Sequence, residues 1–276
     1  MTSKTLNGIS YKWHNKNSKS LPIVMLHGHG ADHQAFNDLL DKIDHPLILL
    51  DLPGFGRSKM LKINSVEAIA SKVALILEQL EIKNYAAIGH SFGTIVGLKL
   101  AENDKKCQKL VLLNALPVFK PIIENFYHIA GKTFTSIPEY ISDSFLNSRI
   151  YKTTGYMLHA RVPLGRSYLG EILSPSIVYP DFKSRAWRES WHSIHEVDQF
   201  RIATNVKCET LIMHGDKDSL TNSDNVELFF SFFAKAKLVR FKNGGHIMHR
   251  EMTRPVALEI TKFLDEPFRS EILRIL

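Results

Sequence analysis

The sequence predicts an α/β fold in which a mostly parallel sheet carries helices on both faces. Six short apolar runs, rich in leucine and β-branched residues, are bounded by glycine, proline, aspartate or asparagine, which is typical of buried parallel strands. Amphipathic segments separate several of these runs, and this alternation favours a parallel sheet. A chain of 276 residues can bury a sizeable core without disulfides or metals. The expected strands are residues 21–26, 47–50, 85–88, 110–113, 210–213 and 238–241.

Three segments between or after these runs are predicted to be helices, namely residues 65–80, 94–102 and 253–265. Segment 65–80 places its apolar side chains on one stripe at helical spacing. Asn64 is suited to cap its N-terminus, and Glu67, three residues later, completes a capping-box-like pair. The apolar C-terminal segment, residues 270–276, fits either a helix packed on the body or a contact with a partner.

Composition excludes several classes of protein. Hydrophobic residues make up 44% of the chain and charged residues 23%, as in ordinary globular domains. The net charge is +7, but lysine and arginine are spread along the chain, so no nucleic-acid partner is expected. No apolar run is long enough to span a membrane, and no apolar leader is visible. We expect a cytoplasmic protein that acts on a small molecule, and the oligomeric state stays open.

The two cysteines, Cys107 and Cys208, are too few for a disulfide framework or a four-cysteine zinc site. We expect both to be reduced and to lie near strand ends. Between the fourth and fifth expected strands, residues 117–207 are helical or irregular in pattern and hold half of the aromatic residues. This segment is interpreted as an inserted helical cap, and residues 1–116 and 208–276 form the core domain.

The segment Gly89–Gly93, which reads G-H-S-F-G, carries the strongest chemical signal. It follows an expected strand and precedes an expected helix, the setting of a nucleophile elbow. Such a turn presents a serine hydroxyl, here that of Ser91, at the carboxyl edge of the sheet. The backbone N–H of Phe92 would then point to where an oxyanion forms.

A serine nucleophile needs a base and an acid that orients the base. The sequence HGDKD at 214–218 and the sequence KNGGH at 242–246 each follow an expected strand, so Asp218 and His246 would converge with Ser91 at the carboxyl edge. Asp216 is an alternative acid and His249 an alternative base. The sequence HGHG at 27–30 also follows a strand, and the backbone N–H of His29 is a candidate second oxyanion donor.

Together these motifs resemble the α/β-hydrolase family. The matching segments are HGHG at 27–30, DLPGFGRS at 51–58, GHSFG at 89–93, HGDKD at 214–218 and GGH at 244–246, in the order of that family. The resemblance implies that Ser91 is the nucleophile, His246 the base and Asp218 the acid. It also implies that the insertion is a cap. The proline and glycines of DLPGFGRS are typical of turns, and we expect this segment, His27 and His90 to shape turns around the site.

No metal or organic cofactor is expected. His27, His29, Asp32 and His33 approach a metal-binding pattern of another hydrolase family, but the aspartate is displaced by one residue. The interpretation is a serine hydrolase that cleaves a carboxylic ester of apolar or aromatic character. Alternatives with the same three residues are hydrolysis of a carbon–carbon bond or a thioester, and a non-enzymatic small-molecule receptor on the same fold.

Overall fold

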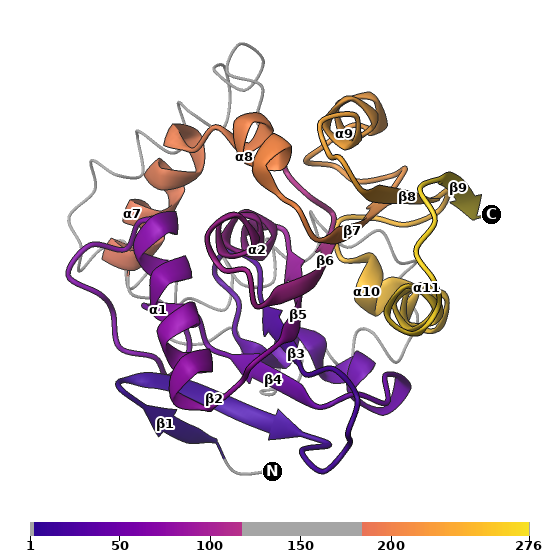
Figure 1. The fold of residues 1–276 in the computed structure, drawn as a ribbon. Coiled ribbons are helices and arrows are strands. Elements are labelled where there is room, and N and C mark those ends of the chain that lie inside the picture. Colours follow the sequence, from indigo (N-terminus) through magenta and orange to yellow (C-terminus); the bar gives the residue numbers. More distant parts are fainter. Residues whose placement is uncertain (1–2, 118–183, 276) are drawn as a thin grey trace, which may run out of the picture.

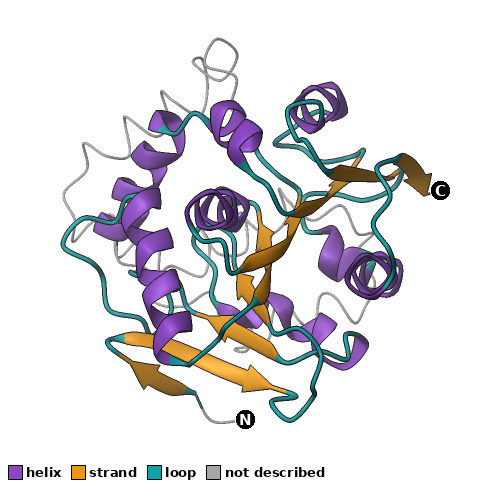
Figure 2. Ribbon diagram, in the orientation of Figure 1, coloured by secondary structure: helices purple, strands orange, loops and turns teal. Residues whose placement is uncertain are grey.

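The computed structural model describes residues 3–117 and 184–275, and these form one twisted sheet with helices on both faces (Figures 1 and 2). The nine strands of this described part run in the spatial order β1-β2-β4-β3-β5-β6-β7-β8-β9. Their bounds are β1 Lys4–Leu6, β2 Ile9–His14, β3 Ile23–Leu26, β4 Leu47–Leu50, β5 Tyr85–His90, β6 Cys107–Leu113, β7 Glu209–Gly215, β8 Ala236–Phe241 and β9 Ile272–Ile275.

All six expected strands are present, as β3 to β8, and they pair in parallel. Their carboxyl ends therefore lie at one edge of the sheet, where a site in such a fold forms. Among the described strands, the antiparallel pairs are β1 with β2 and β2 with β4. The fold class predicted from the sequence is confirmed.

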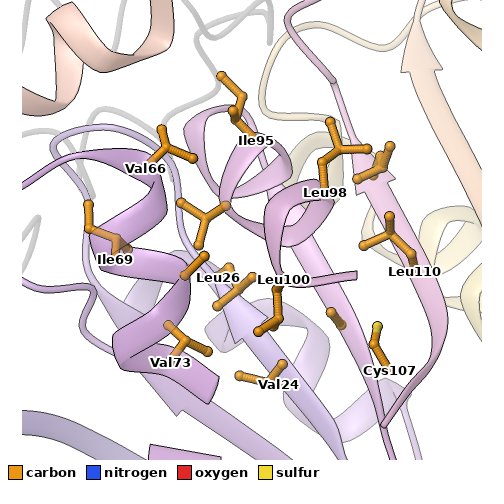
Figure 3. Close-up of a cluster of buried hydrophobic side chains, with 14 of the residues drawn as sticks. Val24, Leu26, Val66, Ile69, Val73, Ile95, Leu98, Leu100, Cys107 and Leu110 are labelled. Atoms are coloured by element: carbon orange, nitrogen blue, oxygen red, sulfur yellow. The ribbon is translucent and has the colours of Figure 1, made fainter. Parts of the chain in front are cut away.

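The helices and the 3-10 segment η1 pack on the two faces of the sheet (Figure 2). One face buries apolar side chains of α1, α2, α8 and α9, and Figure 3 shows α1 and α2 over β3 and β6. The opposite face buries those of η1, α10 and α11. The bounds are η1 His33–Lys42, α1 Val66–Gln79, α2 Phe92–Asn103, α7 Ser184–Glu196, α8 Gln199–Asn205, α9 Ser223–Phe230, α10 Met248–Glu251 and α11 Thr253–Asp265.

The expected N-cap of the first helix was wrong by one residue. Ser65 caps α1, and its hydroxyl accepts a hydrogen bond from the Ala68 N–H at 3.2 Å. Asn64 is buried instead, and its amide donates to the Pro53 carbonyl at 2.7 Å. Both residue types are good caps, so the choice depended on a tertiary contact that the sequence does not display.

Two parts of the sheet were not expected. The C-terminal segment, whose pattern fits a helix or a partner contact, instead forms β9 and pairs in parallel with β8. Strands β1 and β2 lie at the other edge of the sheet, where polar and apolar residues mix and no buried apolar run marks a strand.

Residues 184–207 of the expected cap contain α7 and α8, in keeping with the helical pattern predicted there. The remainder of the insertion, residues 118–183, lies outside the described residues. The division into a core and a cap therefore stays a prediction. Within the described ranges, no helix combines the length and the apolar character that crossing a membrane would require.

Candidate active site

Ser91 occupies a sharp turn between β5, which ends at His90, and α2, which begins at Phe92. Its backbone has φ of 52° and ψ of −117°, in the left-handed half of conformational space that side chains other than glycine rarely adopt. The Ser91 N–H donates to the Leu113 carbonyl of β6 at 3.0 Å, and the Ser91 carbonyl accepts from the Thr94 N–H at 2.9 Å. These bonds hold the serine in the strained conformation that a nucleophile elbow requires.

The glycines on either side of the serine allow this turn to close. A Cβ atom on Gly89 would lie 2.3 Å from the Gly93 carbonyl oxygen, and one on Gly93 would lie 2.0 Å from the Leu26 carbonyl oxygen. Both contacts are with backbone atoms, which cannot move aside. The motif G-x-S-x-G is thus a steric requirement for packing the start of α2 against β3 and β5.

His246 and Asp218 lie side by side at the carboxyl edge of the sheet. His246 Nδ1 is 2.9 Å from Asp218 Oδ2, and the two side chains are only 5% and 0% exposed. Asp218 Oδ1 accepts from the Leu220 N–H at 2.8 Å. Burial raises the pKa of Asp218, but His246 and these hydrogen bonds outweigh burial, so the pKa lies below its ordinary value. The carboxylate is therefore ionised and oriented toward the imidazole.

The two alternative residues take other partners. Asp216 Oδ1 accepts from Arg240 Nε at 2.7 Å and from the Ser223 hydroxyl at 3.0 Å. His249 lies on α10, where its Nε2 is 3.1 Å from the Ala35 carbonyl oxygen. Burial lowers the pKa of His249 to about 3, so its ring is neutral. This geometry favours Asp218 as the acid and His246 as the base.

Asn114 supports the pair from the end of β6. Its Nδ2 donates to Asp218 Oδ2 at 2.9 Å and to the Gly245 carbonyl at 3.2 Å. One carboxamide thereby joins the loop that carries the acid to the loop that carries His246. Asn114 has φ of 50°, a conformation that asparagine tolerates better than most residues.

His90 links the elbow to the His246 loop. Its Nε2 donates to the His246 carbonyl at 2.8 Å, and its ring centre is 4.3 Å from that of His249. Burial and the neighbouring histidines keep the pKa of His90 well below its ordinary value. His27 has a comparable structural part, because its Nδ1 is 2.8 Å from the Gly28 carbonyl oxygen and its Nε2 accepts from the Leu52 N–H at 2.9 Å.

The loop after β3, residues 27–30, runs beside the serine. A Cβ on Gly28 would lie 3.4 Å from Ser91 Cβ and 3.0 Å from His90 Nδ1. The following residue is His29, whose backbone N–H is the expected second oxyanion donor. The other expected donor, the N–H of Phe92, belongs to the first turn of α2, where amides have no partner within the helix.

The His29 side chain ties this loop to α7. Its Nε2 is 2.9 Å from the Ser190 hydroxyl oxygen and 3.1 Å from the Trp187 carbonyl oxygen. Burial lowers the pKa of His29 to about 4, so Nε2 carries the proton of a neutral ring and donates it. The rings of Trp187 and Trp191 stack with their centres 5.4 Å apart, and both lie close to His29. An aromatic cluster thus connects the helix at the base of the insertion with the loop beside Ser91.

The four residues that approach a metal-binding pattern in the sequence do not gather at one place in the structure. His27 and His29 make the contacts above, whereas Asp32, His33 and Asp51 lie together. Asp32 accepts from the Gln34 N–H at 2.8 Å, and Asp51 accepts from His33 Nδ1 at 2.5 Å and from the Arg57 N–H at 3.0 Å. Protein N–H groups thus occupy the carboxylates of this cluster. The expectation of no metal stays a prediction.

Two functional contacts escaped the sequence reasoning. The motifs in the sequence assigned no part in the site to Asn114 or to Ser190. Their partners, Asp218 and His29, are distant in the sequence. Only the position of Asn114 at the carboxyl end of a predicted central strand was available as a signal.

The chain belongs to the α/β-hydrolase fold family, because the family model matches residues 22–251. The family that the motifs predicted is confirmed. Over 240 residues the chain is 23% identical to the AB hydrolase superfamily protein YisY of Bacillus subtilis, and the match covers 82% of this chain and 84% of that protein. It is 21% identical to Lipase 3 of a Moraxella species, covering 91% of this chain and 79% of the lipase.

A shorter match of 141 residues, 29% identical, relates 46% of this chain to 56% of a pimeloyl-[acyl-carrier protein] methyl ester esterase of Legionella pneumophila. Among solved structures, a hydrolase from Pseudomonas aeruginosa has a TM-score of 0.78 at 16% identity, covering 96% of this chain and 98% of that one. An esterase from Exiguobacterium antarcticum has a TM-score of 0.77 at 21% identity, covering 94% of this chain and 96% of the esterase. At these identities the structures establish the fold.

Proposed function

We propose that this protein is a serine hydrolase that cleaves a carboxylic ester through an acyl-enzyme on Ser91. The observation that carries the proposal is the pairing of His246 Nδ1 with the buried Asp218 carboxylate at 2.9 Å, at the same sheet edge as the strained Ser91 turn. A histidine whose Nδ1 is held by an ionised carboxylate leaves Nε2 as the basic atom. One relative named as a lipase and one named as a methyl ester esterase support ester bonds as the substrate class.

In the proposed mechanism, His246 Nε2 removes the Ser91 hydroxyl proton as the oxygen attacks the ester carbonyl. The backbone N–H groups of Phe92 and His29 stabilise the resulting oxyanion. Losing one such donor typically costs about 3 kcal/mol of transition-state stabilisation. His246 then passes its proton to the leaving alcohol, which yields the acyl-enzyme. Water activated by the same histidine releases the carboxylic acid product. Asp218 stabilises the imidazolium in both acylation and deacylation.

An apolar or aromatic substrate is proposed from the surroundings of the loop beside Ser91. His29 lies with its ring centre 5.7 Å from that of Phe55, 5.5 Å from Phe92 and 4.8 Å from Trp187. Trp187 and Trp191 are each partly exposed, so their faces can still gain contact area. Apolar and aromatic side chains are the usual lining of small-molecule sites.

The decisive experiment is steady-state hydrolysis of p-nitrophenyl esters with straight-chain acyl groups of increasing length and with aryl acyl groups. The Ser91→Ala variant keeps the Cβ atom and the backbone of the turn, and it should lower kcat/KM by roughly 10⁴-fold or more. Its free energy of unfolding should match that of the wild type. Turnover by Ser91→Ala at the wild-type rate would overturn the proposal.

A fluorophosphonate probe separates the alternatives that use the same residues. Labelling of Ser91 without turnover of any ester would move the assignment to a thioester or a carbon–carbon bond as the natural target. Binding of small apolar acids without multiple turnover of any of these substrates would favour a receptor.

A further inference from the structure

Both cysteines of the chain lie at the end of the sheet remote from the elbow. Cys107 is the first residue of β6, and Cys208 directly precedes β7. These strands are parallel neighbours, with Lys109 opposite Glu209 in the register. Both thiols therefore lie at the amino ends of adjacent strands, whereas Ser91 follows the carboxyl end of β5.

The two side chains also share one face of the sheet. A register shift opposite Tyr85 and Ala86 interrupts the alternation at the start of β6, and Cys107 joins the same apolar cluster as Leu110 (Figure 3). Cys208 packs against that cluster from its border, close enough for each thiol to shift the pKa of the other, and the Cys107 thiol donates to the Lys109 carbonyl at 3.6 Å. Both cysteines are free in the structure. The sheet thus brings together two sulfur atoms that are far apart in the sequence.

The two thiols differ in accessibility and in acidity. Cys107 is buried, and the contact with Cys208 together with burial raises its pKa well above the ordinary value. Cys208 is partly exposed, and the neighbouring Cys107 thiol lowers its pKa. The negative charge of Glu209 opposes that lowering, and Glu209 itself pairs with Lys109 at 3.0 Å. One accessible, more acidic thiol beside a protected one is the arrangement of an attacking and a resolving cysteine.

We propose that Cys107 and Cys208 form an oxidation site at which a peroxide produces an intramolecular disulfide. The Cys208 thiolate attacks a peroxide oxygen, the O–O bond breaks, and Cys208 becomes a sulfenic acid. The Cys107 sulfur then attacks the Cys208 sulfur, the S–O bond breaks, and hydroxide leaves with the Cys107 proton as water. With hydrogen peroxide, two thiols yield one disulfide and two waters. An external dithiol supplies the two electrons that reverse the reaction.

The positions of Cys107 and Cys208 in the sequence determine how a disulfide between them would affect the stability of the fold. Cys107 lies just before the insertion and Cys208 just after it, so the disulfide closes a loop that contains all of residues 117–207. A cross-link that closes a long loop stabilises a protein mainly by restricting its unfolded chain. Oxidation should therefore raise the thermal midpoint. Because the thiols and Ser91 lie at opposite ends of the strands, this proposal does not depend on the proposed ester hydrolysis.

The first test treats the reduced protein with hydrogen peroxide and then alkylates it under denaturing conditions for mass spectrometry. The expected product is a monomer lighter by about 2 Da, with no alkylated thiol and with one linked pair of peptides. In the untreated protein, alkylated without denaturant, Cys208 should react roughly ten-fold or more faster than Cys107. Wild-type protein that keeps both thiols, or that links only between molecules, would overturn the proposal.

Two matched variants test the order of attack. Cys107→Ser should accumulate a sulfenic acid on Cys208 that dimedone traps, because the resolving sulfur is missing. Cys208→Ser should keep an unoxidised Cys107 under the same conditions, because that thiol is buried. Equal rates of oxidation in the two variants would contradict the assignment of Cys208 as the attacking thiol. The rise in thermal midpoint on oxidation should be absent from both variants.

Discussion

The carboxamide of Asn114 donates to the same Asp218 oxygen that accepts from His246 Nδ1, each at 2.9 Å. A second bond of this amide, to the Gly245 carbonyl at 3.2 Å, secures the residue that precedes His246. Asn114 is therefore the point at which the acid loop and the base loop are connected. Because its side chain donates to the Asp218 carboxylate and to the Gly245 carbonyl, we assign it a positioning role.

Asn114→Gly should lower kcat with little change in KM. Glycine suits the φ of 50° at this position, so the variant removes the amide without adding backbone strain. Loss of a hydrogen bond to a buried charge costs about 1.5 to 3 kcal/mol, which corresponds to a decrease of roughly 10- to 100-fold. The ionised form of Asp218 loses a donor, so its pKa rises and the acid limb of the kcat profile moves to higher pH.

Asn114→Asp is the comparison variant for the dependence of kcat on pH. It keeps the shape of the side chain but places a second carboxylate against Asp218, and like charges should move the acid limb further upward. An acid limb that stays in place in both variants would contradict the positioning role. Urea unfolding of both variants separates a change in the site from a general loss of stability.

Asp218→Asn and Asp216→Asn form a matched pair, because the change is the same and the positions are two residues apart. Asp218→Asn should lower kcat by roughly 10³- to 10⁴-fold, since an amide does not hold the imidazole in its productive form. Asp216→Asn should keep activity within about ten-fold, because Asp216 contacts Arg240 and Ser223. Steady-state hydrolysis of one ester at several pH values measures both. The opposite order of effects would assign the acid to Asp216.

Gly93→Ala should destabilise the protein by about 3 kcal/mol or more, because the added Cβ meets the Leu26 carbonyl at 2.0 Å. Gly97→Ala, one turn later in α2, is the control. Its Cβ would lie 3.2 Å from Leu110 Cδ1, a flexible side-chain end, and alanine favours the helix by about 1 kcal/mol. The control should stay within about 1 kcal/mol of the wild type. Urea denaturation measures both changes, and equal stability of the two variants would refute the steric explanation of the motif.

Because of the buried Asp51 carboxylate, the free energy of unfolding should depend on pH in the acid range. Burial raises its pKa, but hydrogen bonds from His33 and Arg57 lower it to about 2, below the ordinary value of 3.8. A carboxyl group whose pKa is lower in the folded state stabilises the fold when it is ionised, above about pH 4. This contribution is lost as the pH falls from 4 towards 2. Asp51→Asn should therefore cost about 2 kcal/mol at pH 7 and much less at pH 2. A constant difference in unfolding free energy between these pH values would contradict this account.

Much of the fold could be predicted because its signals are local. The six central strands are continuous apolar runs, since helices cover both faces of the parallel strands. Strands β1 and β9 are the edges of the sheet and β2 is next to β1, and in this part of the sheet burial is incomplete and the apolar signal weakens. The N-cap of α1 shows that a contact from a distant loop cannot be predicted from local sequence. Ser65 rather than Asn64 caps the helix, because the Asn64 amide donates to the Pro53 carbonyl.

By itself, the sequence determined the family, the central strands and the turn around Ser91, because each depends on residues that are close together in the chain. Only the tertiary structure decided that Asp218 rather than Asp216 pairs with His246, and that Asn114 and Ser190 support the two loops. Likewise, only the register of β6 and β7 brings Cys107 to Cys208. The physical reason is that hydrogen bonds and sulfur contacts depend on distances of a few ångströms between residues that the fold, and not the chain, makes neighbours.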